Sequence, residues 1–124
     1  MTTLFDIAQN WLNQDPDAET HAELTALLTA AKNGDEKALA ELQARFSGRL
    51  QFGTAGLRGP LQAGPMGMNR VLVAQAAGGL ADYLKDYDKQ PSIVIGYDGR
   101  KNSDVFARDT AEIMAGAGVK AYLL

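Results

Sequence analysis

Apolar residues recur at helical spacing through the first 48 residues and predict three helices with polar outer faces. The first helix is expected over residues 4–12 and the second over residues 22–31, after which Gly34 supplies a left-handed stop. Asp35 can cap the third helix, which should end near residue 48. Nothing in these helices resembles catalytic chemistry, so we expect them to form a packing extension.

From residue 49 the pattern changes to short apolar runs that alternate with longer amphipathic segments. Short strands are expected over residues 49–52 and 119–124, and helices over residues 69–85 and 104–116. The strongest strand signal is residues 92–97, a continuous β-branched run of the kind buried on both faces of a sheet. This strand-helix-strand-helix-strand order predicts an α/β fold with parallel crossover connections.

Two adjacent glycines, Gly78 and Gly79, lie inside the predicted helix of residues 69–85. Glycine in a helix interior costs about 1 kcal/mol relative to alanine. We therefore expect close packing of this helix on the sheet, where a side chain would not fit.

Composition and charge limit the classes of function. The chain has 124 residues, about one domain's worth, with ordinary apolar and charged fractions of 46% and 22%. A net charge of −3 argues against nucleic-acid binding, which depends on clustered Lys and Arg. No apolar run approaches the ~20 residues of a membrane helix, and no signal-peptide pattern is visible. The absence of cysteine excludes a thiolate metal site or a disulfide framework and fits a reducing cytoplasm.

Two aromatic residues of the helical segment are interpreted as structural. His21 is the only histidine, so neither a histidine-based metal site nor a Ser-His-Asp triad is expected within this chain. His21 is expected to be a solvated helix residue, and Trp11 a packing anchor.

The least ordinary run of the chain is FGTAGLRG at residues 52–59, with three glycines at a spacing of three. Glycine lets backbone N–H groups approach a ligand closely, and the fork of donors on Arg58 suits a phosphate. The run is therefore a candidate anion site. Its spacing matches neither the dinucleotide-binding fingerprint nor the P-loop. A tight turn with a surface arginine is the alternative interpretation.

A second cationic loop, GYDGRKNS at residues 96–103, follows the strongest predicted strand. In an open parallel sheet, ligands gather beyond the carboxyl ends of the strands. Arg100 and Lys101 could thus join Arg58 in a phosphate site. The alternative is structural: Asp98 holds backbone N–H groups, Arg100 pairs with Asp98, and Ser103 caps the next helix.

Together the two loops resemble the α-D-phosphohexomutase superfamily of phosphoglucomutases, phosphomannomutases and phosphopentomutases. Residues 52–59 are similar to its first signature, residues 96–100 to its second strand-end signature, and Asn69 to the Met-Asn start of its first long helix. The helical extension is similar to the subgroup of phosphopentomutases and glucose-1,6-bisphosphate synthases. Residues 65–69 depart from that subgroup's usual Asn-Arg before Met-Asn.

The resemblance implies a three-layer α/β/α fold with a mostly parallel sheet. Residues 49–124 would form an incomplete first domain of four, and residues 1–48 the helical extension before it. The parent would be a Mg²⁺-dependent phosphosugar mutase that moves phosphate between sugar positions through a phosphoserine and a bisphosphate intermediate. A sugar bisphosphate would be its activator and a phosphosugar its substrate.

The resemblance also implies roles for residues of the first loop. Arg58 would face the phosphoserine and support the phosphoryl group, while Thr54 and Gly56 shape the phosphate-binding loop. Arg100 and Lys101 are further phosphate-binding candidates. No residue here matches the family's phosphoserine, magnesium ligands or base, so the chain alone is expected to hold no metal and to be inactive.

Three alternatives stay open for the parent protein. It could be a phosphopentomutase, a hexose-bisphosphate synthase, or a non-catalytic phosphate-binding or interaction module. For the chain itself, an incomplete sheet would leave an edge and an apolar face open. We therefore expect it to associate with itself through the sheet edge, with no nucleic acid and no membrane as partner.

Overall fold

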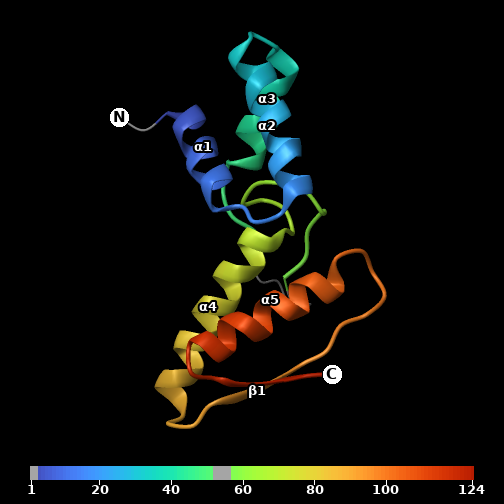
Figure 1. The fold of residues 1–124 in the computed structure, drawn as a ribbon. Coiled ribbons are helices and arrows are strands. Elements are labelled where there is room, and N and C mark those ends of the chain that lie inside the picture. The colour runs from blue at the N-terminus through green and yellow to red at the C-terminus, as the bar shows by residue number, and fades with distance from the viewer. Residues whose placement is uncertain (1–2, 52–56) are drawn as a thin grey trace. The chain divides into compact units, whose positions relative to one another are not determined.

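The computed structural model describes residues 3–51 and 57–124, which form five helices and two strands (Figure 1). They divide into two compact units, Met1–Leu72 and Val73–Leu124. The elements in chain order are α1 (Leu4–Gln14), α2 (Ala18–Lys32), α3 (Glu36–Arg45), α4 (Arg70–Tyr87), β1 (Ser92–Ile95), α5 (Ser103–Gly116) and β2 (Lys120–Leu123). The domain boundary after residue 48 stays a prediction. None of the helices in the described ranges is long and apolar enough to cross a membrane.

Side-chain caps start each of the three helices in the first unit. Thr3 and Asp6 form a reciprocal capping box at α1, and Asp17 accepts from a backbone N–H of α2. Asp35 caps α3 by accepting from two backbone N–H groups. Gly34, at φ +93°, provides the left-handed stop after α2. The three predicted helices are therefore confirmed, together with the cap at Asp35 and the stop at Gly34.

The core of the first unit lies between these helices and the segment that follows them. Leu24 and Leu42 are fully buried, and Trp11 packs edge-on against Phe46 with ring centroids 6.5 Å apart. Trp11 is thus confirmed as a packing anchor, while His21 is exposed on α2. The buried residues of this core are Ala8, Trp11, Leu12, Leu24, Leu28, Ala31, Ala38, Leu42, Ala63 and Val71.

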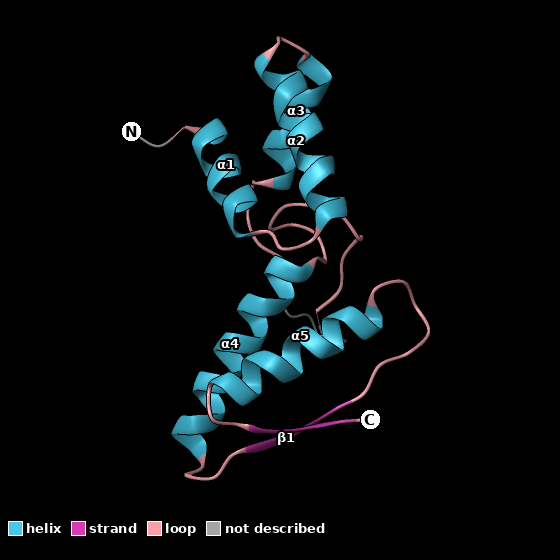
Figure 2. Cartoon of the chain, viewed as in Figure 1, coloured by secondary structure: helices cyan, strands magenta, loops and turns pink. Residues whose placement is uncertain are grey.

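The second unit contains a parallel β-α-β arrangement. Strands β1 and β2 pair in parallel from Ser92 opposite Lys120 to Ile95 opposite Leu123, and α5 connects them (Figure 2). Parallel strands need such a crossover because the C-terminal end of β1 and the start of β2 lie at opposite ends of the strand pair. The core of this unit joins both helices to one face of the sheet through Ala77, Ala81, Met114, Val119, Ile93 and Ala121. The predicted strand-helix-strand order is confirmed for residues 92–123.

The strand expected at residues 49–52 is wrong for its described part. Residues 49–51 form no strand, and the N–H of Leu50 donates to the carbonyl of Pro65 at 2.9 Å. This backbone group is therefore satisfied by a loop and not by a neighbouring strand. The sheet of the described residues has two strands instead of the predicted three.

The expectation that residues 92–97 are buried on both faces is also wrong. Val94 and Tyr122 lie opposite each other on the sheet and are 64% and 48% exposed. The reason is that α4 and α5 share a core with the other face only, through Ile93 and Ala121. In the described residues this unit therefore has two layers, one of helices and one of strands.

Gly78 and Gly79 do not mark a close approach of helix and sheet. A Cβ atom built on either glycine meets nothing within 4 Å. The buried side of α4 in this unit runs through Ala77 and Ala81, so the two glycines lie beside it with open space around them.

Replacing Gly79 by alanine should therefore stabilise the chain by about 1 kcal/mol, because it removes glycine's entropic cost within α4. The matched control is Gly34→Ala, where a Cβ also meets nothing but φ is +93°. That change should destabilise by about 1–2 kcal/mol, since a non-glycine residue is strained there. Urea unfolding followed by circular dichroism measures both. A destabilising Gly79→Ala would show that the glycine is needed for packing.

Candidate functional site

The arginine end of the FGTAGLRG run is the part of the first loop that the structure describes. Residues 52–56 lie outside the described residues, so the roles of Thr54 and Gly56 stay predictions. Leu57 is half-buried, while Arg58 and Gly59 are exposed. A Cβ on Gly59 would come within 2.5 Å of a methyl carbon of Leu50, so only glycine fits there without movement. Arg58 therefore lies next to a glycine that packs closely against the Leu50 side chain, and Arg58 itself is exposed.

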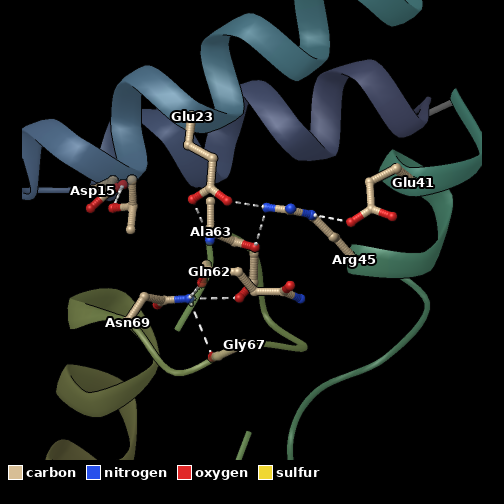
Figure 3. Close-up of polar contacts among 10 residues, drawn as sticks. Asp15, Glu23, Glu41, Arg45, Gln62, Ala63, Gly67 and Asn69 are labelled. Atoms are coloured by element: carbon tan, nitrogen blue, oxygen red, sulfur yellow. Dashed lines mark hydrogen bonds and ion pairs between the residues drawn. The ribbon is translucent and has the colours of Figure 1, made fainter. Parts of the chain in front are cut away.

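Asn69 fastens the loop that follows Arg58. Its side chain is buried, and its Nδ2 donates to the carbonyls of Gln62 at 2.8 Å, Gly64 at 2.7 Å and Gly67 at 3.2 Å (Figure 3). Its Oδ1 accepts from the N–H of Leu72 at 2.9 Å and so caps the start of α4. The helix predicted from residue 69 begins one residue later for this reason. One side chain thereby joins the loop to the helix.

Arg45, the last residue of α3, connects the helices to the same loop. Its Nη1 bonds Oε1 of Glu23 and its Nε bonds Oε1 of Glu41, both at 2.8 Å. The second carboxylate oxygen of Glu23 accepts from the N–H of Ala63 at 3.1 Å, and the carbonyl of Arg45 accepts from the N–H of Met66 at 3.3 Å. Burial lowers the pKa of Arg45, but the hydrogen bonds and charges of Glu23 and Glu41 outweigh it and raise the pKa. The guanidinium therefore stays charged.

The second loop is organised by Asp98. Its Oδ1 accepts from the N–H of Arg100 at 3.1 Å and from Oγ of Ser103 at 2.8 Å, and its Oδ2 lies 3.3 Å from Nε of Arg100. The structural alternative is thus confirmed for Asp98 and Arg100. The expected cap at Ser103 is wrong: Asn102, at φ 68°, precedes α5 without a side-chain cap, and Ser103 lies inside the helix. Arg100 is 84% exposed and Lys101 is also exposed.

The predicted phosphate-binding residues of the two loops lie in different units of the chain. Arg58 belongs to the first unit, and Arg100 and Lys101 belong to the second. Their roles toward phosphate stay predictions. Across residues 3–51 and 57–124, no group of three or more histidine, aspartate and glutamate side chains could hold a metal ion.

The contacts between Glu23, Arg45 and Ala63 escaped the sequence analysis. Glu23 and Ala63 are 40 residues apart, and each lies in a segment whose local pattern suggests only a helix or a loop. The role of Asn69 did leave a signal, because asparagine is among the preferred residues at the start of a helix.

The loops and the β-α-β unit described above belong to a known class of domain. Residues 49–124 match the phosphoglucomutase/phosphomannomutase, alpha/beta/alpha domain I. The chain therefore belongs to the phosphoglucomutase/phosphomannomutase family. The match begins at residue 49, where the sequence pattern changes from helical to mixed.

Several curated proteins are similar to this chain. A probable phosphomannomutase of Haemophilus influenzae is 93% identical over 59 residues, which are 48% of this chain and 12% of that protein. A phosphoribomutase of Saccharomyces cerevisiae is 42% identical over 115 residues, or 92% of this chain and 18% of that protein. A phosphoglucomutase of Staphylococcus haemolyticus is 46% identical over 78 residues, or 63% of this chain and 14% of that protein. The chain thus spans less than a fifth of the length of each. No solved structure matches it.

The geometry around Asp98 predicts a pH effect. Its pKa is lowered first by the hydrogen bond from Ser103 and then by the hydrogen bond from the N–H of Arg100; burial opposes this, and the charge of Arg100 adds a smaller lowering effect. Because the folded-state pKa lies below the unfolded value, the stabilisation is present above the unfolded pKa and is lost as pH falls through the folded pKa. Ser103→Ala should raise the pKa of Asp98 toward its ordinary value.

NMR titration of the Asp98 carboxyl carbon measures this change. Thr110→Ala is the matched control, because the Thr110 hydroxyl on the same helix donates to the carbonyl of Phe106 and not to Asp98. An Asp98 pKa that does not move in Ser103→Ala would contradict the arrangement.

Proposed function

We propose that this chain is the N-terminal part of a Mg²⁺-dependent phosphosugar mutase of the phosphoglucomutase/phosphomannomutase type, active in carbohydrate metabolism. The family match over residues 49–124 carries the proposal. In the proposed reaction a phosphoserine of the longer protein gives its phosphoryl group to a sugar monophosphate. The resulting sugar bisphosphate, also the activator, then returns its other phosphoryl group to the serine. No residue of this chain matches that serine.

Arg58 is the residue of this chain that we assign to the reaction. Catalysis of phosphoryl transfer consists largely of positioning and of stabilising the negative charge spread over the phosphoryl oxygens. A guanidinium suits this role because it is always charged and offers paired donors. We propose that Thr54 and Gly56 shape the loop around the phosphate, with Arg100 and Lys101 as further contacts in the longer protein.

The remaining parts of the proposal concern the longer protein. We place the Mg²⁺ ligands in the longer protein, because no residue of this sequence matches the magnesium loop of the family. We also propose that the open face of the β1–β2 sheet is covered there, which would complete a three-layer α/β/α domain with a mostly parallel sheet. A phosphosugar substrate and a cytoplasmic location complete the proposal, and the lack of cysteine fits the latter.

A pentose phosphate is the second candidate substrate. The phosphoribomutase of Saccharomyces cerevisiae matches 92% of this chain, including the helical residues before position 49. A phosphopentomutase is therefore the runner-up to a hexose phosphate mutase. A hexose-bisphosphate synthase and a non-catalytic phosphate-binding module are further outcomes that an assay distinguishes.

The function is tested by a mutase assay of the full-length protein and of this chain. Glucose-1-phosphate, mannose-1-phosphate and ribose-1-phosphate are offered with Mg²⁺ and a bisphosphate primer. We expect an active full-length protein and an inactive chain. Arg58→Ala in the full-length protein should lower kcat by about 10²–10³, the usual loss when one such donor is removed.

Arg108→Ala serves as the control for Arg58→Ala, because Arg108 is an exposed arginine of α5 outside both loops. Activity in this chain alone would contradict the proposal. A full-length protein that lacks mutase activity but still binds phosphate through Arg58 would favour the non-catalytic phosphate-binding module.

We also propose that the chain associates with itself through its open sheet edge. Val94 on the open face of the sheet and Leu124 just after β2 are 64% and 80% exposed, and an apolar face beside an open strand edge invites pairing with another chain. Val94→Lys should shift light scattering toward the monomer. The control is Leu80→Lys, an equally apolar exposed residue on α4. A chain that is monomeric at high concentration would contradict this proposal, and an equal effect of Leu80→Lys would contradict the role of the sheet.

A further inference from the structure

We propose that Glu23 and Arg45 are a positioning pair for Arg58: they hold the segment of residues 60–69, so that the N-terminal helices set where Arg58 lies. This inference rests on the proposed function of Arg58. The pair would act through the segment of residues 60–69, which is separated from Arg58 by Gly59 alone and which both residues contact. Neither residue would touch the phosphate itself.

The first step of the argument is that Glu23 uses both of its oxygens. Oε1 accepts from Arg45 at 2.8 Å, and Oε2 accepts from the backbone N–H of Ala63 at 3.1 Å (Figure 3). Arg45 adds a longer contact of 3.5 Å from Nη1 to the carbonyl of Ala63. Glu23 and Arg45 thus bond both backbone polar groups of Ala63, its N–H and its carbonyl. Ala63 is fully buried, so without Glu23 its N–H would be left without this acceptor away from water.

The second step is that the same loop contacts the backbone at the end of α3. The N–H of Met66 donates to the carbonyl of Arg45 at 3.3 Å. Gly64 has φ +98°, and a Cβ placed on it would lie 3.2 Å from both Cβ and O of Arg45. Residue 64 therefore favours glycine both for its backbone angle and for its close packing against Arg45.

The third step connects this contact to Arg58. The N–H of Met68 donates to the carbonyl of Pro60 at 2.8 Å, and Leu61 forms a parallel bridge with Met68. Pro60 follows Arg58 by two residues, and the intervening Gly59 is close-packed against Leu50. A shift of the loop at Ala63 would thus be carried by a short, internally bonded segment to Arg58.

The Glu41–Arg45 ion pair shows what a purely structural contact looks like here. It has the same 2.8 Å distance, but Glu41 contacts Arg45 from within α3 and forms no hydrogen bond to the described part of the loop. Arg45 is 14% exposed, whereas Glu41 is 49% exposed. Exposed pairs at this helical spacing contribute little to stability. Glu41 therefore offers a matched control for Glu23.

The test compares Glu23→Gln with Glu41→Gln in this chain, with inorganic phosphate as the probe. Glutamine has the shape of glutamate, but an NH2 group replaces one of the two oxygens, so either Arg45 or the N–H of Ala63 would face a donor instead of an acceptor. NMR titration measures the phosphate dissociation constant, with Arg58→Ala as the reference without the site. We expect Glu23→Gln to weaken Arg58-dependent binding by about tenfold, the scale of a hydrogen bond to a charged group. Glu41→Gln should leave it within about twofold.

Amide hydrogen exchange of the unsubstituted chain provides a measurement that needs no variant. If the pair and the phosphate site are coupled, each must stabilise the other. Saturating phosphate should therefore slow exchange at the N–H groups of Ala63 and Met66. Arg45→Lys, which keeps the charge but loses the fork of donors, should reduce this protection.

The outcomes separate the two proposals. If the unsubstituted chain shows no Arg58-dependent phosphate binding, the proposed phosphate site is wrong. If it binds phosphate through Arg58 but a folded Glu23→Gln binds equally well, the positioning pair is wrong and the contact is only structural. If Glu23→Gln fails to fold, the exchange measurement on the unsubstituted chain decides. Amide exchange at Ala63 and Met66 that does not slow when phosphate is added would overturn the inference.

Discussion

The carboxylate of Glu23 is the interaction on which the first unit depends. It accepts from a guanidinium on one side and from a loop N–H on the other, and so joins α2, α3 and the loop in one network. A partly buried charge is costly unless it is paired with an opposite charge and its donors or acceptors are hydrogen-bonded. Arg45 meets this condition through Glu23 and Glu41, and no buried side-chain polar atom of the described residues lacks a partner. Helices α2 and α3 therefore bond directly to the loop of residues 60–69 and do not merely pack beside it.

The second unit is held by a different force, the burial of a small apolar cluster. Met114 and Val119 are its largest buried side chains, and both strands contribute to the same covered face of the sheet through Ile93 and Ala121. Burying such side chains stabilises by about 1.5–3 kcal/mol each, but only on the side that helices cover. The opposite face, with Val94 and Tyr122, gains nothing in this chain. This open face is the one that we propose the longer protein covers.

Two arginines that looked equivalent in the sequence have different surroundings. Both follow a glycine-containing loop, and both were candidates for phosphate binding. Arg100 is paired with Asp98, whose carboxylate also holds Ser103 and orders the turn before α5. Arg58 lies at the end of the run that resembles the family's first signature. For these reasons the proposed function assigns the main role to Arg58. Arg100 is bonded to Asp98 within its own loop and is proposed only as a further phosphate contact.

The sequence by itself determined the elements whose causes are local. The cap at Asp35, the stop at Gly34 and the β-branched strand at residues 92–95 all depend on neighbours within a few positions. Family membership could be read from two ordered motifs. Tertiary structure alone decided which backbone group Leu50 bonds, that Gly78 and Gly79 face open space, and that Glu23 meets Ala63. These outcomes depend on partners many residues away, because a donor, a cavity or a buried face exists only once distant segments have packed together.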